Sequence, residues 1–596
     1  MKITRLGAGV GVVAAGALVL AGCSVPYESE VIENTEITVS WNDIVDNFNT
    51  DSTAGNNVAN SNIEYMTSAS FNYYNDSPDL VQNTDFGSYE KTSDDPLTVE
   101  YTINDNVVWS DGTAVDEADL LLAWVTTFGA FTTEGEDGET YLFNHANPRP
   151  DLATQLPEID DRKLTLVYDK AFVDWEVQFG VGQVAAHAAV MLAYPDIEDP
   201  QEAKDQFVEA VQNDDVDWLT PVADVWNSDF QSANTPDNEL KYLSYGPYIV
   251  EELVEEDYVT LVANESFAWG PSPKYQRITV RQIADPTAQV QALQNQDVQV
   301  ASGQPTPDVL ELVQATDTAE YYTGDEATYE HVDLTFNNGG PFDPATYGGD
   351  EEKAQMVRIA FLKTIPRQEI LEKLIHPLNP TAEVRDSTLT IPGSPFYDGI
   401  VTENGSAEFA EVDIDGAKQL LADAGVTGPV EVKFWYPEGN ARRAAEYELI
   451  ATSAALAGFD VVDDSEPNWE FTDTTAFPVN PHDAVIFAWA STSLALTGSD
   501  QYLGTGQPSN FGGYSNEVVD QRLKDLETEL DEGEQQQILI DVEKELWADG
   551  YGITIFQFPG LTAWDKGVEG IAPAPLAPYY FWNFWEWAPV SGAAAE

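Results

Sequence analysis

The sequence predicts a mixed α/β protein made of a few large lobes. Strand-like and helix-like segments alternate along its second half, which is typical of α/β folds. The strand-like segments are residues 278–283, 332–336, 430–435 and 484–489, and the helix-like segments are residues 288–295, 351–365, 416–424 and 518–530. The length of 596 residues would suit about four domain-sized units. No repeat, low-complexity linker or change of composition divides residues 37–589, however, and 43% of the chain is hydrophobic, so we expect interwoven lobes with substantial cores.

The first 22 residues have the layout of a secretory signal peptide. Lys2 and Arg5 form a cationic head, and residues 6–20 are apolar or small but too few to span a membrane comfortably. The stretch Leu20-Ala21-Gly22-Cys23 follows, and it resembles the bacterial lipobox, in which the cysteine is lipidated and the peptide is cut just before it. Cys23 is the only cysteine, so no disulfide can form within the chain. The alternative is a coincidental cysteine behind an ordinary signal.

Acidic residues dominate the charge of the chain. The formal net charge is −77, from 103 acidic and 26 basic residues, which argues against a nucleic acid or an anionic lipid surface as a partner. We interpret the charge as a hydrated surface suited to a saline exterior, with an ordinary soluble secreted protein as the alternative. Residues 23–36 carry four glutamates and few apolar side chains, so they are predicted to form a solvated tether between the anchor and the fold.

Local signals in the first half of the chain predict strands, two helices and a hairpin. The expected strands are residues 37–41, 97–103 and 164–168, and a helix is expected over residues 175–194. Asp116 is predicted to cap a helix over residues 117–128, because its side chain can accept hydrogen bonds from the free N–H groups of the first turn. Residues 246–250 and 258–262 are expected to pair as a β-hairpin.

Two later segments resemble binding sites, one for calcium and one for a lipid or carbohydrate, but we predict structural roles for both. Residues 411–416 look like the opening of a calcium loop, but the twelfth position, which needs a bidentate carboxylate, is Ala422. We therefore expect Asp413 or Asp415 to cap a helix there. The aromatic run at residues 579–587 is predicted to pack as a terminal strand, with a lipid or carbohydrate patch as the alternative.

The sequence lacks the common motifs of catalysis and cofactor binding. It contains no Gly-Lys-Ser/Thr phosphate loop and no Gly-x-Ser-x-Gly elbow. Its five histidines are too far apart for a zinc-type pair on one helix. With 103 carboxylates, an acid pair like that of a glycosidase is expected by chance. We predict no catalytic residue, no metal site and no cofactor; the enzymatic alternative is a secreted hydrolase with a carboxylate pair among aromatic side chains.

Several separated motifs follow one another in a fixed order. Residues 109–115 (WSDGTAV) with Ala118 and Asp119 follow the pattern W-S-D-G-T-P-V-T-A-x-D, with Ala114 in place of proline. The other motifs are residues 246–248 (GPY), 261–270, 334–337, 341–343, 357–358, 366–367, 415–425, 483–489 and 513–520. Together they resemble the bacterial extracellular solute-binding proteins of family 5, the oligopeptide and dipeptide receptors of ABC importers.

The resemblance implies a two-lobed fold of the large periplasmic-binding-protein type, which closes on its ligand about a hinge. Residues 37–284 would form the first lobe, with an extra subdomain at about 66–195, residues 285–556 would form the second lobe, and residues 557–596 would return to the first. The resemblance also implies a monomer on the outer face of a bacterial membrane. It would bind a peptide or another small molecule and deliver it to a membrane permease and an ATPase encoded elsewhere.

The expected ligand site departs from that of peptide-binding relatives. They usually place an aspartate, which pairs with the peptide's amino terminus, three residues beyond the tryptophan that corresponds to Trp489; here that residue is Thr492. No lysine or arginine lies between Arg443 and Arg522, so this part of the second lobe offers no clamp for a ligand carboxylate. Asp500 could supply the missing charge. A non-peptide ligand, such as a sugar, a chelated metal or an opine-like compound, stays open.

The predicted site joins the two lobes. The second lobe would contribute Trp489, Ser491, Thr492 and Ser493, and the first lobe would contribute Phe71, Tyr73 and Trp226, with Asn337 as a further candidate. Aromatic walls would contact apolar parts of the ligand, and hydroxyl groups would bind its polar groups. For each aromatic residue, packing in the core is the alternative.

Overall fold

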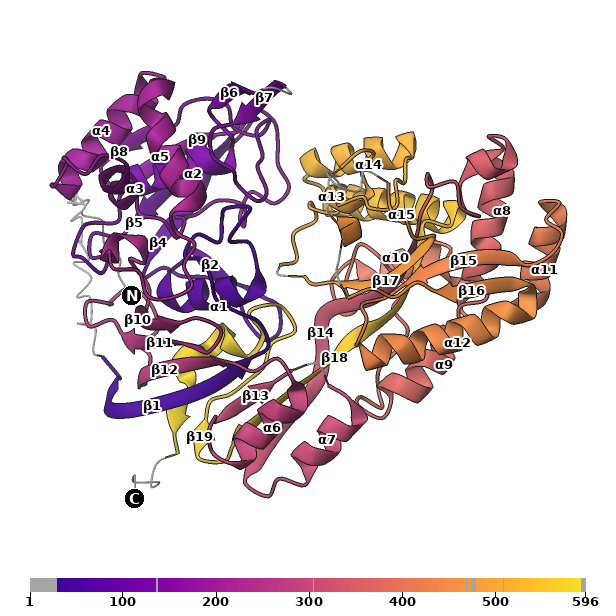
Figure 1. Cartoon of the computed structure of the whole chain (residues 1–596). Helices are drawn as coiled ribbons and strands as arrows, with labels where there is room; N and C mark the ends of the chain where they lie inside the picture. The colour runs from indigo at the N-terminus through magenta and orange to yellow at the C-terminus, as the bar shows by residue number, and fades with distance from the viewer. Residues whose placement is uncertain are drawn as a thin grey trace, which may run out of the picture.

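Two bodies flank a pair of long strands in the computed structural model of the chain (Figure 1). The structure describes residues 29–135, 138–303, 305–467, 470–472, 479–491, 493–507 and 509–590. The predicted signal peptide, Cys23 and Thr492 therefore lie outside the described residues. Among the helices of the described part of the chain, none is both long enough and apolar enough to cross a membrane.

One ten-stranded sheet runs through both bodies, in the order β10-β11-β12-β1-β13-β18-β14-β17-β15-β16. The strands are β1 (Ile32–Trp41), β10 (Tyr248–Val254), β11 (Tyr258–Ala263), β12 (Tyr275–Gln282), β13 (Val300–Ser302), β14 (Ala319–Leu334), β15 (Val430–Trp435), β16 (Phe459–Asp463), β17 (Ala484–Trp489) and β18 (Gly552–Asp565). The predicted hairpin is confirmed, because β10 and β11 pair antiparallel. β1 begins within the predicted tether, and β13, which the sequence placed in the second lobe, pairs with it at Val300.

Strands β14 and β18 carry the chain between the lobes (Figure 1). They pair antiparallel on both sides of an irregular stretch between Asp325 and Tyr329. Before this stretch β14 pairs only with β18, and after it β14 also pairs with β17 of the second lobe. Inside it, the N–H of Ala327 donates to the carbonyl of Pro575 at 2.7 Å instead of to a neighbouring strand. The pairing of β14 with β18 is therefore interrupted at residues 326–328, between the two lobes.

The first lobe adds a four-stranded sheet, small hairpins and helices to its part of the large sheet. These elements are β2 (Asn72–Tyr74), β3 (Leu80–Gln82), β4 (Gly87–Asp94), β5 (Leu97–Ile103), β6 (Thr132–Gly135), β7 (Gly138–Tyr141), β8 (Glu158–Asp160), β9 (Lys163–Val167), α1 (Val58–Thr67), α2 (Glu117–Thr127), α3 (Ala186–Ala193), α4 (Pro200–Gln212), α5 (Val216–Ser228), η1 (Glu239–Lys241), α6 (Pro286–Gln294) and α7 (Pro307–Gln314). The helix predicted over residues 175–194 was wrong for residues 175–185. Gly180 and Gly182 weaken a helix there, because glycine loses the most backbone entropy on ordering.

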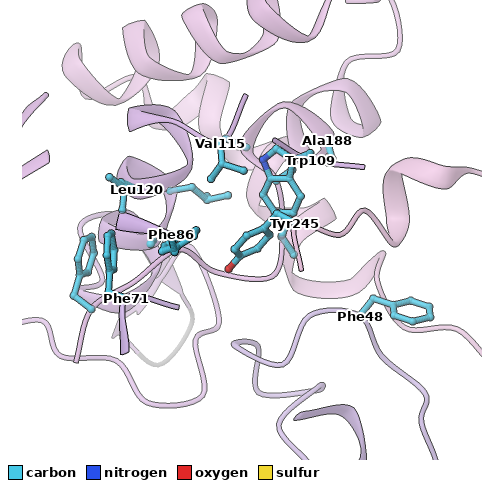
Figure 2. Packing of buried hydrophobic residues seen from close by; sticks show 14 of the residues in the cluster. Phe48, Phe71, Phe86, Trp109, Val115, Leu120, Ala188 and Tyr245 are labelled. Atoms are coloured by element: carbon cyan, nitrogen blue, oxygen red, sulfur yellow. The ribbon is translucent and has the colours of Figure 1, made fainter. Parts of the chain in front are cut away.

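Trp109, the first residue of the W-S-D-G-T motif, packs in the core of the first lobe (Figure 2). Trp109 is fully buried, its indole N–H donates to Asp119 Oδ2 at 3.3 Å, and its ring lies 4.6 Å from that of Tyr245. Asp119 also completes a capping box with Asp116 at the start of α2, which confirms the predicted cap. Lys204 neutralises both carboxylates, with Nζ 2.9 Å from an oxygen of each. This motif therefore builds the lobe rather than a ligand site.

The second lobe covers its strands with helices, and Phe558 near the middle of β18 packs against its core. Its helical elements are η2 (Pro344–Tyr347), α8 (Glu351–Leu362), α9 (Arg367–Ile370), η3 (Leu371–Ile375), α10 (Tyr397–Glu403), η4 (Ser406–Phe409), α11 (Ile414–Asp423), α12 (Ala441–Ala457), η5 (Glu470–Thr472), α13 (Asp500–Leu503), α14 (Glu517–Thr528) and α15 (Glu532–Asp549). Asp413 caps α11 by accepting from the N–H of Gly416 at 2.8 Å, as predicted.

The aromatic tail returns to the first lobe, but not as the predicted strand. After the short strand β19 (Val568–Glu569) it forms the 3₁₀ helix η6 (Tyr579–Glu586), and the two-residue strand β20 (Ala588–Pro589) follows. Tyr580, Phe581 and Phe584 are buried in the first-lobe core. The Tyr580 hydroxyl donates to the carbonyl of Ser40 on β1 at 3.0 Å. Helical spacing lets the tail present several rings to one side, which an extended strand would divide between two faces.

Candidate functional site

A cavity of about 450 Å³ lies in the second lobe, where β17 ends. Trp489, the last residue of that strand, forms one wall, and the loop that follows it forms the rim. The other described residues that line the cavity are mainly Tyr329, Arg385 and residues 388–391, 394–396, 490–491, 493–499 and 501–502. The cavity thus combines the end of a strand with the loops beside it.

Trp489 is held by aromatic stacking. Its ring lies 5.4 Å from that of Tyr502 and 6.2 Å from that of Phe511, with interplanar angles of 26° and 20°. The indole nitrogen is buried and has no hydrogen-bond partner among the described residues, and the same holds for the hydroxyls of Ser394 and Ser499. Buried polar groups in folded proteins almost always have a partner. These three unpaired groups belong to residues that line the cavity.

Arg385 brings a cation to the wall of this cavity. Its guanidinium lies 3.6 Å from the centre of the Tyr329 ring, which is a cation–π contact. Nε donates to the carbonyl of Ser387 at 2.7 Å, and Nη1 donates to Gln557 Oε1 at 2.9 Å. Burial lowers the pKa of Arg385. Arg385 lies outside residues 444–521, the stretch without lysine or arginine, and only the fold brings it to this cavity.

Glu543 fixes the loop that follows Arg385. Its Oε1 accepts hydrogen bonds from the N–H of Thr388 at 2.7 Å, the N–H of Leu389 at 2.8 Å and the hydroxyl of Ser387 at 2.7 Å. Burial raises the pKa of this carboxyl, although the three donors oppose the shift. The loop is therefore a preformed wall.

A second cavity, of about 540 Å³, lies in the first lobe beside α1, β2 and η6. Tyr73 and Trp585 form an aromatic corner, with ring centres 5.4 Å apart and an interplanar angle of 73°. Tyr65 extends this corner, 6.4 Å from Trp585. Two carboxyl groups, those of Asp51 and Glu64, also line the cavity, and none of the described residues that line it is a lysine or an arginine. The first-lobe cavity is therefore acidic and aromatic.

The carboxyl of Glu64 shows the electrostatic character of the first-lobe cavity. It accepts a short hydrogen bond from the hydroxyl of Thr50. Burial and the nearby charge of Asp51 nevertheless raise the pKa of Glu64 to about 8. The pKa of Tyr73 in the aromatic corner is also raised, because its hydroxyl is partly buried and the charge of Glu586 adds to the shift. A positive charge in the cavity would oppose these upward shifts of pKa.

The two lobes touch beside the cavities. Asn72 and Tyr73 line the first-lobe cavity, and the hydroxyl of the next residue, Tyr74, interacts with the backbone of Leu494 in the wall of the second-lobe cavity. Strand β2 therefore connects the two cavity walls.

The structure brings only part of the predicted site to the cavities. Trp489, Ser491 and Ser493 line the second-lobe cavity, and Tyr73 lines the first-lobe cavity. Thr492 lies outside the described residues, so its role stays a prediction.

The other predicted residues lie elsewhere. Phe71 is buried against Phe86, with ring centres 5.0 Å apart, and Trp226 packs against Phe143. Both aromatic residues therefore occupy the core, the alternative given for them. Asn337 is exposed and lines neither cavity.

Asp500 does not line the second-lobe cavity. Its carboxylate instead lies 3.8 Å from Nη1 of Arg149 in the first lobe. Asp51, Asn62, Glu64 and Arg385 line the cavities but were not predicted, because no local motif marks them.

Known proteins resemble the chain over most of its length. The family model of the bacterial extracellular solute-binding proteins, family 5 Middle, matches residues 77–510. An uncharacterized lipoprotein of Mycobacterium leprae (strain TN) is 27% identical over 600 residues, covering 97% of this chain and 97% of that protein. The oligopeptide-binding protein OppA of Mycobacterium tuberculosis (strain ATCC 25618 / H37Rv) is 23% identical over 507 residues, covering 84% of this chain and 76% of that protein.

A solved structure shares the two-lobed fold. The periplasmic EDTA-binding protein EppA superposes with a TM-score of 0.76 at 20% identity, covering 95% of this chain and 98% of that one. The fold class predicted from the sequence is thus confirmed. Because the family model spans most of the chain, the protein belongs to the bacterial extracellular solute-binding proteins of family 5.

Proposed function

We propose that this protein is the substrate receptor of an ABC importer and that it binds oligopeptides without turning them over. The observation that carries the proposal is the second-lobe cavity, where Trp489 supplies an aromatic wall and an unpartnered indole N–H. A peptide suits such a wall, because it offers both apolar side chains and backbone carbonyl groups. The kinship with an oligopeptide-binding protein supports the same ligand class.

Binding would follow from movement of the lobes about β14 and β18. The interrupted ladder at residues 326–328 provides the bend, and each lobe carries one cavity. Closure would bring ligand groups into contact with both walls and exclude water, which strengthens every hydrogen bond to the ligand. The predicted division into lobes at residues 37–284, 285–556 and 557–596 belongs to this proposal, with α6, β13 and α7 moved to the first lobe and the bend at β14 and β18.

The proposal includes an anchor and partners. A lipid on Cys23 would hold the receptor on the outer face of the membrane, where a permease and an ATPase would receive the ligand. A lipoprotein among the relatives supports the anchor. We propose a monomer, since one chain carries both lobes and both cavities.

A non-peptide solute is the second candidate. Arg385 and the unpartnered donors near Trp489 could also bind an anionic compound such as a metal chelate, and a structural relative is named for binding EDTA. The residue at the usual position of the peptide-pairing aspartate is Thr492, which is compatible with such a ligand.

Mass spectrometry of the compound that co-purifies with the protein, followed by titration calorimetry with that compound and with peptide pools, tests the proposal. Replacing Trp489 by alanine should weaken binding at least about tenfold, because the stacked wall and a buried donor are lost. Trp218→Phe is the control, since Trp218 stacks on Tyr194 in the first lobe away from both cavities. Failure of every pool and extract to bind would contradict a receptor, whereas release of cleaved products would favour the hydrolase.

A further inference from the structure

We propose that the first-lobe cavity is a subsite for an organic cation, an ammonium or guanidinium group of the transported ligand, held by Asp51 and Glu64. This inference rests on the proposed receptor function and names the chemistry of its ligand. It assigns a binding role to a wall that no sequence motif marks.

The charge of the cavity calls for a cation. Asp51 and Glu64 line it together, and the described lining residues include no lysine or arginine to neutralise them. His145 acts electrostatically on Asp51, but burial lowers the pKa of His145 and so favours its neutral form. A buried carboxylate without a counter-ion is costly, and the raised pKa of Glu64 expresses this cost. A cation from the ligand would remove it.

A buried amide points to the same place independently of charge. Asn62 lines the cavity from α1 and is only 2% exposed. Neither its side-chain nitrogen nor its side-chain oxygen has a hydrogen-bond partner among the described residues. An amide with both groups unpaired is unusual in a protein interior. A ligand group that carries N–H donors would satisfy the oxygen of Asn62 and the two carboxyls together.

The aromatic corner suits the rest of such a group. Tyr65, Tyr73 and Trp585 line the same cavity as the acidic residues, and cations are attracted to the faces of aromatic rings. The volume of about 540 Å³ also leaves room for the methylene groups of a long basic side chain. The cavity therefore provides carboxyls for the charged end and rings for the apolar stem.

The backbone around Asp51 leaves space for its carboxylate. The carbonyl of Asp51 accepts from the N–H of Ala146 at 2.8 Å, and the N–H of Thr50 donates to Gln183 Oε1 at 3.1 Å. A methyl group at Gly182 would lie 2.7 Å from Asp51 Oδ2. The lack of a side chain at Gly182 thus leaves room for the Asp51 carboxylate. A Gly182→Ala substitution would displace this carboxylate without removing its charge.

Three tripeptides provide the test: Ala-Lys-Ala, Ala-norleucine-Ala and Ala-Glu-Ala, titrated into the full chain by calorimetry. The lysine peptide should bind about tenfold or more tightly than the norleucine peptide, since hydrogen bonds to charged groups are the strong ones. N-acetylated forms of the same peptides distinguish a basic side chain from the amino terminus as the source of the cation. Whether the cation is the lysine side chain or the amino terminus, the subsite is supported if substitutions at Asp51 and Glu64 abolish the gain in affinity that this cation provides.

Asp51→Asn and Glu64→Gln should remove the preference for the cation, and Gly182→Ala should reduce it with both carboxyls still present. Glu90→Gln is the matched control, because Glu90 is exposed on β4 outside the cavity. Melting temperatures measured alongside ensure that the variants are folded. The Gly182 variant decides the matter if a carboxyl substitution unfolds the protein.

Two results would overturn the inference while leaving the receptor function intact. One is equal affinity for all three peptides, unchanged in Asp51→Asn, Glu64→Gln and Gly182→Ala. The other is a co-purifying ligand that carries no ammonium or guanidinium group. Absence of any bound compound and of any binding would instead refute the receptor function and this inference with it.

Discussion

The carboxylate of Asp174 in the first lobe binds Thr497 in the second lobe. Its Oδ2 accepts hydrogen bonds from the backbone N–H of Thr497 at 2.8 Å and from the Thr497 hydroxyl at 2.6 Å. Oδ1 accepts the N–H of Leu496 at 2.9 Å. These charge-assisted bonds join the first lobe to the loop that forms the rim of the second-lobe cavity. Removing them with Asp174→Ala should shift the ligand-free protein toward a more open arrangement. Small-angle X-ray scattering should show a larger radius of gyration.

A neighbouring ion pair supplies the control for this prediction. Lys170 Nζ lies 2.6 Å from Glu527 Oε2, but both side chains are partly exposed. Such pairs contribute about 1 kcal/mol or less, so Lys170→Met should change the scattering little. Identical scattering curves for Asp174→Ala and the unchanged protein would show that Asp174 does not hold the lobes together.

Gly246→Ala should destabilise the first lobe. A methyl group at position 246 would lie 2.4 Å from the backbone nitrogen of Ser68 and from the backbone carbon of Thr67, and backbone atoms cannot move aside cheaply. Overpacking of this kind costs about 1–3 kcal/mol. Urea denaturation followed by tryptophan fluorescence should report the loss. Gly180→Ala is the control, because nothing lies within 4 Å of a methyl group there, and similar midpoints for the two variants would contradict the steric explanation.

Local signals in the sequence predicted helix starts better than they predicted the site. Asp116 and Asp413 each accept hydrogen bonds from the first turn of the helix that follows, and that chemistry depends only on near neighbours. The second-lobe cavity was found only through Trp489, which a family motif marks. Arg385 was missed, because its contacts with Tyr329 and Gln557 depend on the folded path of the chain.

Aromatic residues show a second limit of sequence reasoning. Phe71 and Tyr73 stand two residues apart, yet the first is in the core and the second lines a cavity. The composition and hydropathy of the surrounding sequence do not distinguish an aromatic residue that packs in the core from one that lines a ligand cavity. The acidic pair of Asp51 and Glu64 could not be distinguished among 103 carboxylates until α1 placed Glu64 beside the loop that carries Asp51.

Glu330→Gln should strongly destabilise the second lobe. Glu330 is fully buried on β14, with Oε2 2.6 Å from Nη2 of Arg442 and Oε1 3.0 Å from Nε of Arg443. Neutralising one partner leaves buried guanidinium groups short of a counter-ion, which costs about 3–5 kcal/mol. Glu320→Gln, on the exposed part of the same strand, is the control. Equal free energies of unfolding for the two variants would contradict a stabilising role of the buried carboxylate.

Glu446→Gln should change stability in a manner that depends on pH. Glu446 is fully buried on α12, with Oε1 3.2 Å from Nε of Arg442. Burial raises the pKa of its carboxyl to about 8 from an ordinary value of 4.5, the charge of Glu330 adds to the shift, and the two arginines oppose it. Between these two values the folded protein keeps a proton that the unfolded chain has lost. The contribution of Glu446 to stability therefore falls as the pH rises from about 4.5 to about 8.

Glutamine does not titrate, so the free energy of unfolding of the Glu446→Gln variant lacks this decrease with rising pH. At pH 5 the protonated Glu446 and a glutamine are both neutral, and the two proteins should have similar free energies of unfolding. Toward pH 8 the free energy of unfolding of the variant, relative to that of the unchanged protein, should rise. Urea denaturation at pH 5, 6.5 and 8 measures this difference. A difference that stays constant with pH, or that falls as the pH rises, would mean that the arginines keep Glu446 ionised in the folded protein throughout this range.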